Sequence, residues 1–206
     1  MKAETAPRRQ RRDGAQTRAK VLDAVVETIL DEGYYRASSN EFARRAGVTW
    51  GTIQHQFGTR EQLLLAVLSE RWDAWDQTVA GASVVGSTLE ERLDSVFGLL
   101  QQHYGNREML AMLQILLDLS LNPDSSAETR AAAARHGEAY ARGFMPLFAD
   151  ALGEYATADN VRYAFLTIRG ALLGNLVAID LGSTQLGAGI RRRIVAGIAA
   201  VVAAAD

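Results

Sequence analysis

Polar side chains without a single acid occupy one face of a short segment near the amino terminus. Residues 49–57 read TWGTIQHQF, in which Ile53 and Phe57 stand four apart and give a narrow inward face at helical spacing. The outer positions carry hydroxyl, indole, amide and imidazole groups: Thr49, Trp50, Thr52, Gln54, His55 and Gln56. Such groups contact phosphates and base edges. The segment therefore indicates a helix that reads nucleic acid, with a plain solvent-facing polar helix as the alternative.

A second short helix is predicted directly before this segment. Ser38 has the side chain to cap it, and Glu41 stands three residues later as the reciprocal partner of a capping box. Gly47 stands where a left-handed residue ends a helix, and we expect Val48 to be buried in the turn. Thr49 then caps the reading segment. Gly51 leaves room for a phosphate near the amino end of that segment, where free N–H groups favour anions.

The run from Gly33 to Leu64 resembles the DNA-binding domain of the tetracycline-repressor (TetR) family. The family's spacing is kept from Gly33 to Leu64 without an insertion or deletion. The parts that carry the likeness are Gly33-Tyr34, SSNEFARRAGV from Ser38 to Val48, TWGTIQHQF from Thr49 to Phe57, and TREQLL from Thr59 to Leu64. Gln54 stands where the family usually has an aromatic residue, and Asn40 or Trp50 where Lys or Arg is common. The motif covers roughly the first third of the chain. The family's ligand-binding half varies too much to be matched residue by residue.

The resemblance and the side-chain chemistry together indicate which residues contact DNA: Ser38, Ser39, Asn40, Thr49, Trp50, Gly51, Thr52, Gln54, His55 and Arg60. Asn40 and Trp50 are expected at base edges, because Asn suits adenine and Trp suits a thymine methyl group or a sugar. The expected phosphate contacts, which would also set the register, come from Thr49, Thr52, Gln54, His55 and Arg60. For Arg60 a plain exposed position is the alternative.

Helical periodicity also runs through the segments that flank the motif. Residues 17–32 form the helix that supports the reading pair, and Tyr34 is assigned to the core. Thr59 and Gln62 form another capping box, which opens a helix that extends to Ala80 and is about 30 Å long. That helix would act as a rigid lever between the two halves of the chain.

Five further apolar repeats follow, and no strand-like alternation competes with them. They lie at 89–100, 109–119, 125–144, 161–179 and 190–201. Ser125 and Glu128 are predicted to cap the third, and Pro146 to kink or end it, because proline has no N–H to donate. The fold class is therefore predicted to be all-α, with a three-helix helix-turn-helix domain followed by a helical bundle.

The last two predicted helices have more apolar surface than one small bundle can cover. Gly170 and Gly174, four apart, would let another helix approach closely. We expect two copies of the chain to pair through these helices in a four-helix interface, with an ordinary intrachain core as the alternative. The TetR resemblance implies the same homodimer, and two-fold symmetry would place two reading helices on a palindromic site.

Charge is distributed unevenly along the 206 residues, although the net charge is only −2. Residues 1–60 hold 11 Lys/Arg against 7 Asp/Glu and the remainder holds 11 against 17, so one end suits a polyanion. We expect a disordered basic arm at 1–15, a helix-turn-helix domain at 16–62, and a ligand-binding and dimerisation domain at 63–206. The arm could lie along phosphates or enter a minor groove; a solvated tail without specific contacts is its alternative.

Aromatic and Met side chains are frequent in the central helices, where they can line an apolar site or simply fill the core. The TetR resemblance implies a site for a small, often apolar or aromatic effector. The candidates for that site are Trp72, Trp75, Phe97, Tyr104, Met109, Met112, Leu113, Leu116, Tyr140, Phe144 and Arg169. Arg169 lies on an otherwise apolar helix and could pair with an anionic ligand or with an acid of the chain.

Catalytic motifs are absent from the sequence, which has no nucleophile elbow, no His-Glu-x-x-His and no phosphate loop. The chain has no Cys, and its three histidines are too scattered to suggest a metal site; His103 and His136 are expected to be exposed. No apolar run reaches the roughly 18 residues of a membrane helix, and the basic amino terminus lacks a secretory apolar stretch. We therefore expect a cytoplasmic protein that is not an enzyme, needs no cofactor or metal, and does not enter a membrane.

The hypothesis from these observations is a transcriptional repressor that binds double-stranded DNA as a homodimer and is released by a small-molecule effector. The effector would tilt the 59–80 helix and move the two reading helices apart. One alternative is an activator or an effector-independent architectural DNA-binding protein with the same fold. Another is a helical-bundle binding protein or enzyme in which the amino-terminal motif is coincidental.

Overall fold

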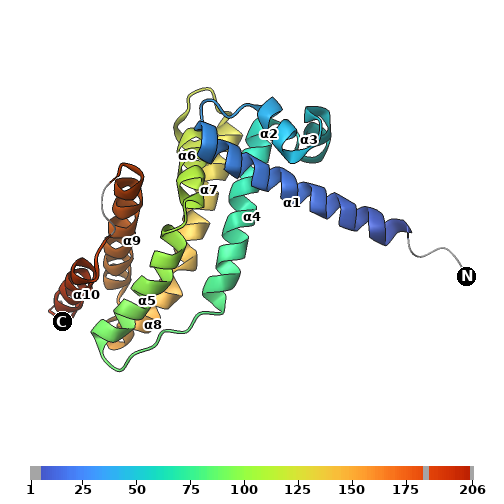
Figure 1. The fold of residues 1–206 in the computed structure, drawn as a ribbon. Coiled ribbons are helices and arrows are strands. Elements are labelled where there is room, and N and C mark those ends of the chain that lie inside the picture. The colour runs from blue at the N-terminus through green and yellow to red at the C-terminus, as the bar shows by residue number, and fades with distance from the viewer. Residues whose placement is uncertain (1–5, 183–185, 205–206) are drawn as a thin grey trace, which may run out of the picture. The chain divides into compact units, whose positions relative to one another are not determined.

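The protein is all-α, as the sequence predicts, in a computed structural model that describes residues 6–182 and 186–204, apart from the side chains of 6–13 and 180 (Figure 1). The α-helices are α1 (Ala6–Glu32), α2 (Ser39–Ala46), α3 (Trp50–Phe57), α4 (Arg60–Ala80), α5 (Leu89–Tyr104), α6 (Glu108–Leu121), α7 (Ala127–Gly143), α8 (Met145–Leu152), α9 (Ala158–Asp180) and α10 (Ala188–Ala203). A single 3-10 turn, η1 (Gly153–Tyr155), follows α8. Contacts divide the chain into two compact units, one of Met1–Arg71 with Ala111–His136 and one of Trp72–Leu110 with Gly137–Asp206.

The first unit contains α1, α2 and α3, the start of α4 and most of α6. Helix α1 packs along α2, and α2 contacts α3. The apolar stripe predicted for α1 is buried, and Ile29, at its end, is 1% exposed. Phe42 of α2 and Ile53 of α3 are fully buried, so one small core joins all three helices.

The amino-terminal segment differs from the expected disordered arm at 1–15. Helix α1 already begins at Ala6, while residues 1–5 lie outside the described residues. Three properties explain the extension. Ala, Arg and Gln are good helix formers, Pro7 lies in the first turn where proline is tolerated, and a helix anchored by a buried stripe propagates cheaply.

The second unit is built around α5, which contacts α8, α9 and α10. Leu93, Phe97 and Leu100 of α5 are fully buried at its centre. As Pro146 predicts, the preceding helix ends: α7 stops at Gly143, and Pro146 lies in the first turn of α8. The predicted cap of α7 was one residue off. The hydroxyl of Ser126, not of Ser125, accepts the N–H of Thr129 at 3.0 Å.

One arginine anchors the last helix onto α5. The guanidinium of Arg191 donates from Nε and Nη2 to the two carboxylate oxygens of Asp94, at 2.6 and 2.7 Å, and also lies over the ring of Phe97. A two-pronged contact of this kind fixes both position and rotation of a helix. It sets the register of α10 on α5, and Val195, Ile198 and Val202 of α10 are buried.

Replacing Arg191 by Met should therefore destabilise the protein. Asp94 is 45% exposed, so we expect a loss of only about 1–2 kcal/mol. In thermal unfolding followed by circular dichroism, that loss corresponds to a midpoint about 2–8 °C lower. The exposed neighbour Arg192, changed to Met, is the matched control and should leave the midpoint unchanged. Equal effects of the two substitutions would contradict the anchoring role.

Candidate nucleic-acid interface and ligand site

The turn between α2 and α3 is held by backbone caps at the positions the sequence indicates. The hydroxyl of Ser38 accepts the N–H of Glu41 at 3.2 Å and begins α2. Gly47 ends that helix in the left-handed conformation, with φ of 70°, and the N–H of Val48 donates to Ala43 at 3.0 Å. The hydroxyl of Thr49 accepts the N–H of Thr52 at 3.2 Å and begins α3. Two short helices thus meet at a fixed angle.

Two details of the motif differ from the prediction. Glu41 does not complete a capping box with Ser38, because its carboxylate accepts two N–H groups from Arg44. That arginine holds the pKa of Glu41 below its usual value. Val48, expected to be buried in the turn, is only half-buried. The turn therefore depends on the two hydroxyl caps and on Gly47.

Helix α3 presents its polar groups outward, as its pattern predicts. Ile53 is fully buried and Phe57 half-buried, on the inward side. Exposed positions follow on the other side: Thr49, Gly51, Thr52, Gln54 and His55. Trp50 is half-buried, so its indole both rests on the protein and reaches solvent. The hydroxyls of Thr49 and Thr52 lie 2.9 Å apart at the amino end of the helix, where an anion would be favoured.

Helix α1 holds α3 from behind. The guanidinium of Arg18 lies 4.7 Å from the centre of the Phe57 ring, and Gln56 donates a long 3.5 Å hydrogen bond to the carbonyl of Gly14. An eight-residue helix is marginal in isolation, so these contacts and Ile53 are needed to keep its outer face in place. The residues at the start of α2 that are predicted to contact DNA are also accessible. Ser38 and Asn40 are exposed, and Ser39 is half-buried.

Arg60 is placed differently from the expected phosphate contact. Its Nη1 donates to the carbonyl of Ala37 at 2.7 Å, and its guanidinium lies over the rings of Phe42 and Tyr34, at 5.0 and 5.7 Å. Arg60 thus ties the start of α4 to the loop before α2. Sequence position alone cannot distinguish a guanidinium turned to solvent from one folded against nearby rings.

Two exposed arginines beside the motif were missed by the sequence reasoning. Arg36 lies in the loop before α2, and Arg44 lies on α2 itself. The neighbouring Arg45 of α2 forms an ion pair with Asp31 of α1. A basic residue two positions before the cap of α2 was the available signal for Arg36. Arg36 would add positive charge beside the acid-free face of α3, whereas the charge of Arg44 is partly balanced by its ion pair with Glu41.

The amino-terminal motif is recognised by comparison with known proteins. A family model described as "Bacterial regulatory proteins, tetR family" matches residues 21–67, which include α2, α3 and the supporting part of α1. The amino-terminal region of the chain is thus similar to the DNA-binding region of that family.

Curated relatives match part of the chain. The fatty acid metabolism regulator protein of Bacillus subtilis is 28% identical over 74 residues, which are 36% of this chain and 38% of the relative. The HTH-type transcriptional regulator BetI 1 of Chromohalobacter salexigens is 38% identical over 60 residues, 29% and 30% of the two chains. The match thus spans less than half the length of these curated relatives.

Solved structures extend the likeness in fold to most of the chain. FadR of Bacillus subtilis, in complex with stearoyl-CoA, gives a TM-score of 0.62 at 19% identity, over 89% of this chain and 96% of FadR. A transcriptional regulator from Rhodococcus sp. Rha1 gives 0.68 at 14% identity, over 91% and 96%. At these identities the likeness concerns the fold.

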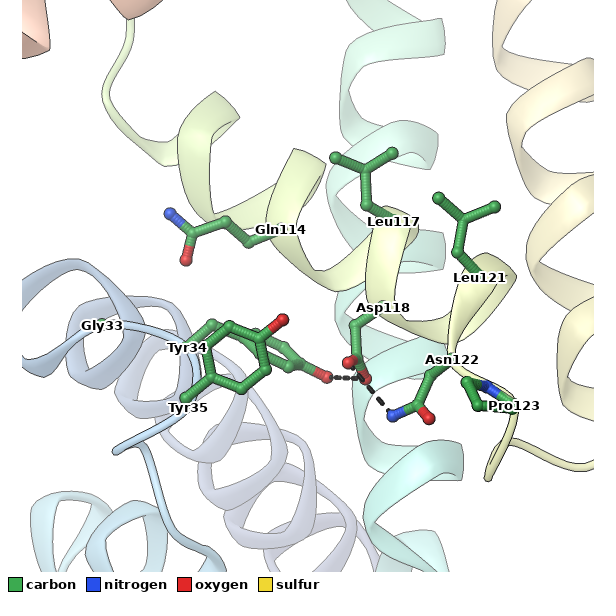
Figure 2. Close-up of a pocket in the computed structure, with 9 residues that line it drawn as sticks. All are labelled: Gly33, Tyr34, Tyr35, Gln114, Leu117, Asp118, Leu121, Asn122 and Pro123. Carbon is green, nitrogen blue, oxygen red and sulfur yellow. Dashed lines mark hydrogen bonds between the residues drawn. The ribbon is translucent and has the colours of Figure 1, made fainter.

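A hydrogen bond links the loop between α1 and α2 to α6. The hydroxyl of Tyr34, in the loop after α1, donates to a carboxylate oxygen of Asp118 at 2.6 Å, and Asn122 donates to the other at 3.3 Å (Figure 2). Burial, and then this bond, raises the pKa of Tyr34 above its usual value. Tyr34 is buried as predicted, but its link to Asp118 was missed; an isolated acid on an apolar helix was the signal.

An open groove of about 750 Å³ lies beside this bond. Tyr35, Leu117 and Leu121 border it, and all three expose large apolar surface (Figure 2). The groove contains none of the residues expected to bind an effector. Those residues fall in both units: Met112, Leu113 and Leu116 lie in the first, and the rest lie in the second.

Five side chains of the second unit meet in an aromatic cluster, which we call the His103 cluster: Trp75, His103, Tyr104, Tyr140 and Phe144. Trp75 stacks on His103 with ring centres 3.8 Å apart, and Phe144 lies 5.9 Å from Trp75. Nε2 of His103 is 2.6 Å from the hydroxyl of Tyr140, which donates to that of Tyr104 at 3.1 Å. Trp72 adjoins the cluster, with its ring centre 5.3 Å from that of Tyr140, and Phe97 and Met109 are also buried in this unit.

His103 was expected to be exposed, and this was wrong. It is half-buried between rings, and burial lowers its pKa to about 4. The imidazole is therefore neutral near pH 7. The error arose because a lone histidine gives no periodic signal, and its partner Tyr140 lies on a different helix.

The placement of Arg60 gives a prediction that separates its two possible roles. Changing Arg60 to Met removes the hydrogen bond to Ala37 and the ring contacts, so we expect a lower thermal midpoint. The slope of log affinity against log salt concentration should stay the same if Arg60 makes no phosphate contact. The loss of a phosphate contact would instead reduce the size of that slope by about 0.9. Measurement combines thermal unfolding with fluorescence anisotropy on a DNA duplex at several salt concentrations. Arg44 changed to Met is the control; a reduced slope for the Arg60 variant would restore the phosphate role.

Proposed function

We propose that this protein is a transcriptional repressor that binds a palindromic operator as a homodimer and is released by a small apolar or aromatic effector. The observation that carries the DNA-binding part is the outer face of α3. It exposes hydroxyl, amide and imidazole groups without an acid, on a helix held by caps and by buried Ile53. The protein acts as a cytoplasmic regulator and not as an enzyme.

Within that interface the side chains divide by chemistry. Thr49, Thr52, Gln54 and His55 grip phosphates, because they surround the amino end and outer face of α3. Trp50 and Asn40 meet base edges. Trp50 suits this role because its indole is braced against the protein while part of it remains accessible.

Support for the homodimer comes from α9 and α10. The inward stripe of α9 contains Phe165, Ile168 and Leu172, all buried. On the opposite face, at helical spacing, lie Tyr163, Leu166, Gly170, Gly174, Val177 and Leu181. The four larger hydrophobic residues Leu166, Val177, Ile190 and Val201 on the two helices are 47–55% exposed. A Cβ built on Gly170 or Gly174 would meet open space. Such a face would be covered by a second copy.

Support for an effector comes from the His103 cluster and from the continuity of α4. That helix carries Trp75 and begins at Arg60, which holds the loop before the reading pair. An effector that displaces Trp75 would tilt α4, and Arg60 would pass the movement to α2. Two similar folds have been solved with small ligands, FadR with stearoyl-CoA and the multidrug binding protein EbrR with imidazole.

Binding to genomic DNA fragments tests the proposal. A mobility-shift assay should retain specific fragments, with an affinity that falls steeply as salt rises. Fragments should then be released as effector is added. An architectural protein would bind without sequence preference and respond to no small molecule, and a bundle enzyme would retain no fragment. An activator would be distinguished by increased transcription from the same operator.

Trp50 changed to Ala should relax sequence preference. Losing a base-edge contact should lower the ratio of operator to random-DNA affinity by about tenfold. Anisotropy on operator and scrambled duplexes measures that ratio. Thr52 changed to Ala is the comparison and should weaken both duplexes alike. If the Trp50 variant also weakens both alike, the indole contacts the backbone instead.

Leu166 changed to Glu should prevent dimer formation. A carboxylate in the centre of the α9 face would be desolvated on pairing, which costs several kcal/mol. Light scattering after gel filtration should then give half the mass of the unmodified protein, with an unchanged helical spectrum. Gln102 of α5 is also exposed, and its change to Glu should leave the mass unaffected. A Leu166 variant of full mass would exclude this face as the interface.

A further inference from the structure

Among the residues that the structure describes, Nε of Arg169 on α9 and Nε1 of Trp75 on α4 are buried without a hydrogen-bond acceptor. A buried donor left unsatisfied costs about 1–3 kcal/mol, and more when it is charged. Such groups are rare in folded proteins, and each requires an explanation.

Arg169 is the more unusual of the two because its charge is not balanced. Among the described residues no carboxylate forms an ion pair with it, whereas Arg191 of the same unit makes a two-pronged pair with Asp94. Its guanidinium lies 5.7 Å from the centre of the Phe165 ring on the preceding turn. A ring face offers only partial compensation for a desolvated charge.

The polar groups beside Arg169 include the hydroxyl of Tyr104, to which it hydrogen-bonds, and that of Tyr140. Burial raises the pKa values of both Tyr104 and Tyr140, so their hydroxyls stay neutral near pH 7. His103 is neutral as well, with its pKa near 4. Asp76 approaches Tyr140 but forms no ion pair with Arg169 among the described residues, and burial, then Asp73, raises its pKa. Among the described residues, Arg169 thus has a hydroxyl and a ring as partners but no carboxylate paired with it.

Aromatic rings border the same region. Phe144 lies 5.7 Å from Phe165 in a stacked arrangement, and 5.9 Å from Trp75. Phe165 in turn lies beneath the guanidinium of Arg169. A flat ring packed against these side chains would gain stacking and burial, while an attached acceptor would meet the guanidinium.

We propose that the effector is a planar aromatic carboxylate, whose carboxylate binds the guanidinium of Arg169 and whose ring packs against Trp75, Phe144 and Phe165. This inference rests on the proposed function, because it gives the chemical class of the effector of that site. The carboxylate supplies the negative charge that the chain itself does not place there. The indole N–H of Trp75 takes a further acceptor of the ligand.

The two ends of this site have different roles. Arg169 provides affinity and selects acids over neutral rings, since a guanidinium binds a carboxylate with two parallel hydrogen bonds. Trp75 couples ligand binding to α4. A ligand that moves the Trp75 ring away from His103 also moves α4, because Trp75 lies on that helix. Arg169 on α9 thus determines which chemical class of effector binds, and Trp75 on α4 determines how the protein responds.

Direct binding of matched probes tests the inference on the full-length protein. The acids are benzoate and 1-naphthoate, and the neutral partners are benzamide and 1-naphthamide, which keep ring and shape but lose the charge. Isothermal titration calorimetry should give at least one acid an affinity about 10- to 100-fold above its amide, as expected for a charge-assisted pair. Quenching of tryptophan fluorescence should accompany binding.

The substitution Arg169→Met should remove this preference. Acid binding should fall about 10- to 100-fold while amide binding remains, and the thermal midpoint should not fall, because the buried Nε without an acceptor is removed. Arg162→Met, at an exposed position two turns earlier on α9, is the matched control and should retain the preference. Arg169→Lys should retain part of it, since charge remains without the planar fork.

Several outcomes would overturn the inference. These are equal binding of acids and amides, failure of both acids to bind at millimolar concentration, or equal weakening of acid and amide by Arg169→Met with a lower thermal midpoint. The last would make Arg169 a structural support of Tyr104. Calorimetry involves no DNA, so failure to retain any genomic fragment would overturn the proposed function separately, whatever the probes show.

Discussion

The burial of Ile53 beneath a helix of eight residues is the constraint on which the DNA interface depends. A helix this short does not persist on its own, since nucleation costs more than so few hydrogen bonds return. Three devices compensate: the hydroxyl caps at its start, the left-handed Gly47 before it, and the contacts from α1 behind it. Because stability comes from the inner side and the ends, every outer side chain remains available for contact.

The His103 cluster shows the opposite arrangement. There the polar groups face inward and are linked to one another, from the imidazole through two tyrosine hydroxyls. Such a network is favourable only when every member is satisfied, and two donors beside it are not. A domain that existed only to be stable would have apolar side chains at these positions. The two donors instead fit the effector site proposed above.

Local signals in the sequence predicted local structure well. The hydroxyls of Ser38, Thr49 and Thr59 all cap helices as their spacing indicates, and Pro146 interrupts its helix. The errors concern choices between equivalent partners, such as Ser126 in place of Ser125 as a cap. They also concern side chains whose partners lie far away in sequence. Arg60 folds against Phe42, and Tyr34 binds Asp118 across 84 positions, which no short window can contain.

The separation of tasks on α3 affects how this protein can change over evolutionary time. Ile53 and the caps preserve the shape of the helix, while Thr52, Gln54 and His55 bury nothing that the fold needs. With the contacts proposed above, substitutions at these outer positions would change the overall affinity for DNA without a cost in folding, and a change of target sequence would come from Asn40 and Trp50. Duplicated copies of such a gene could therefore diverge in target while keeping one scaffold.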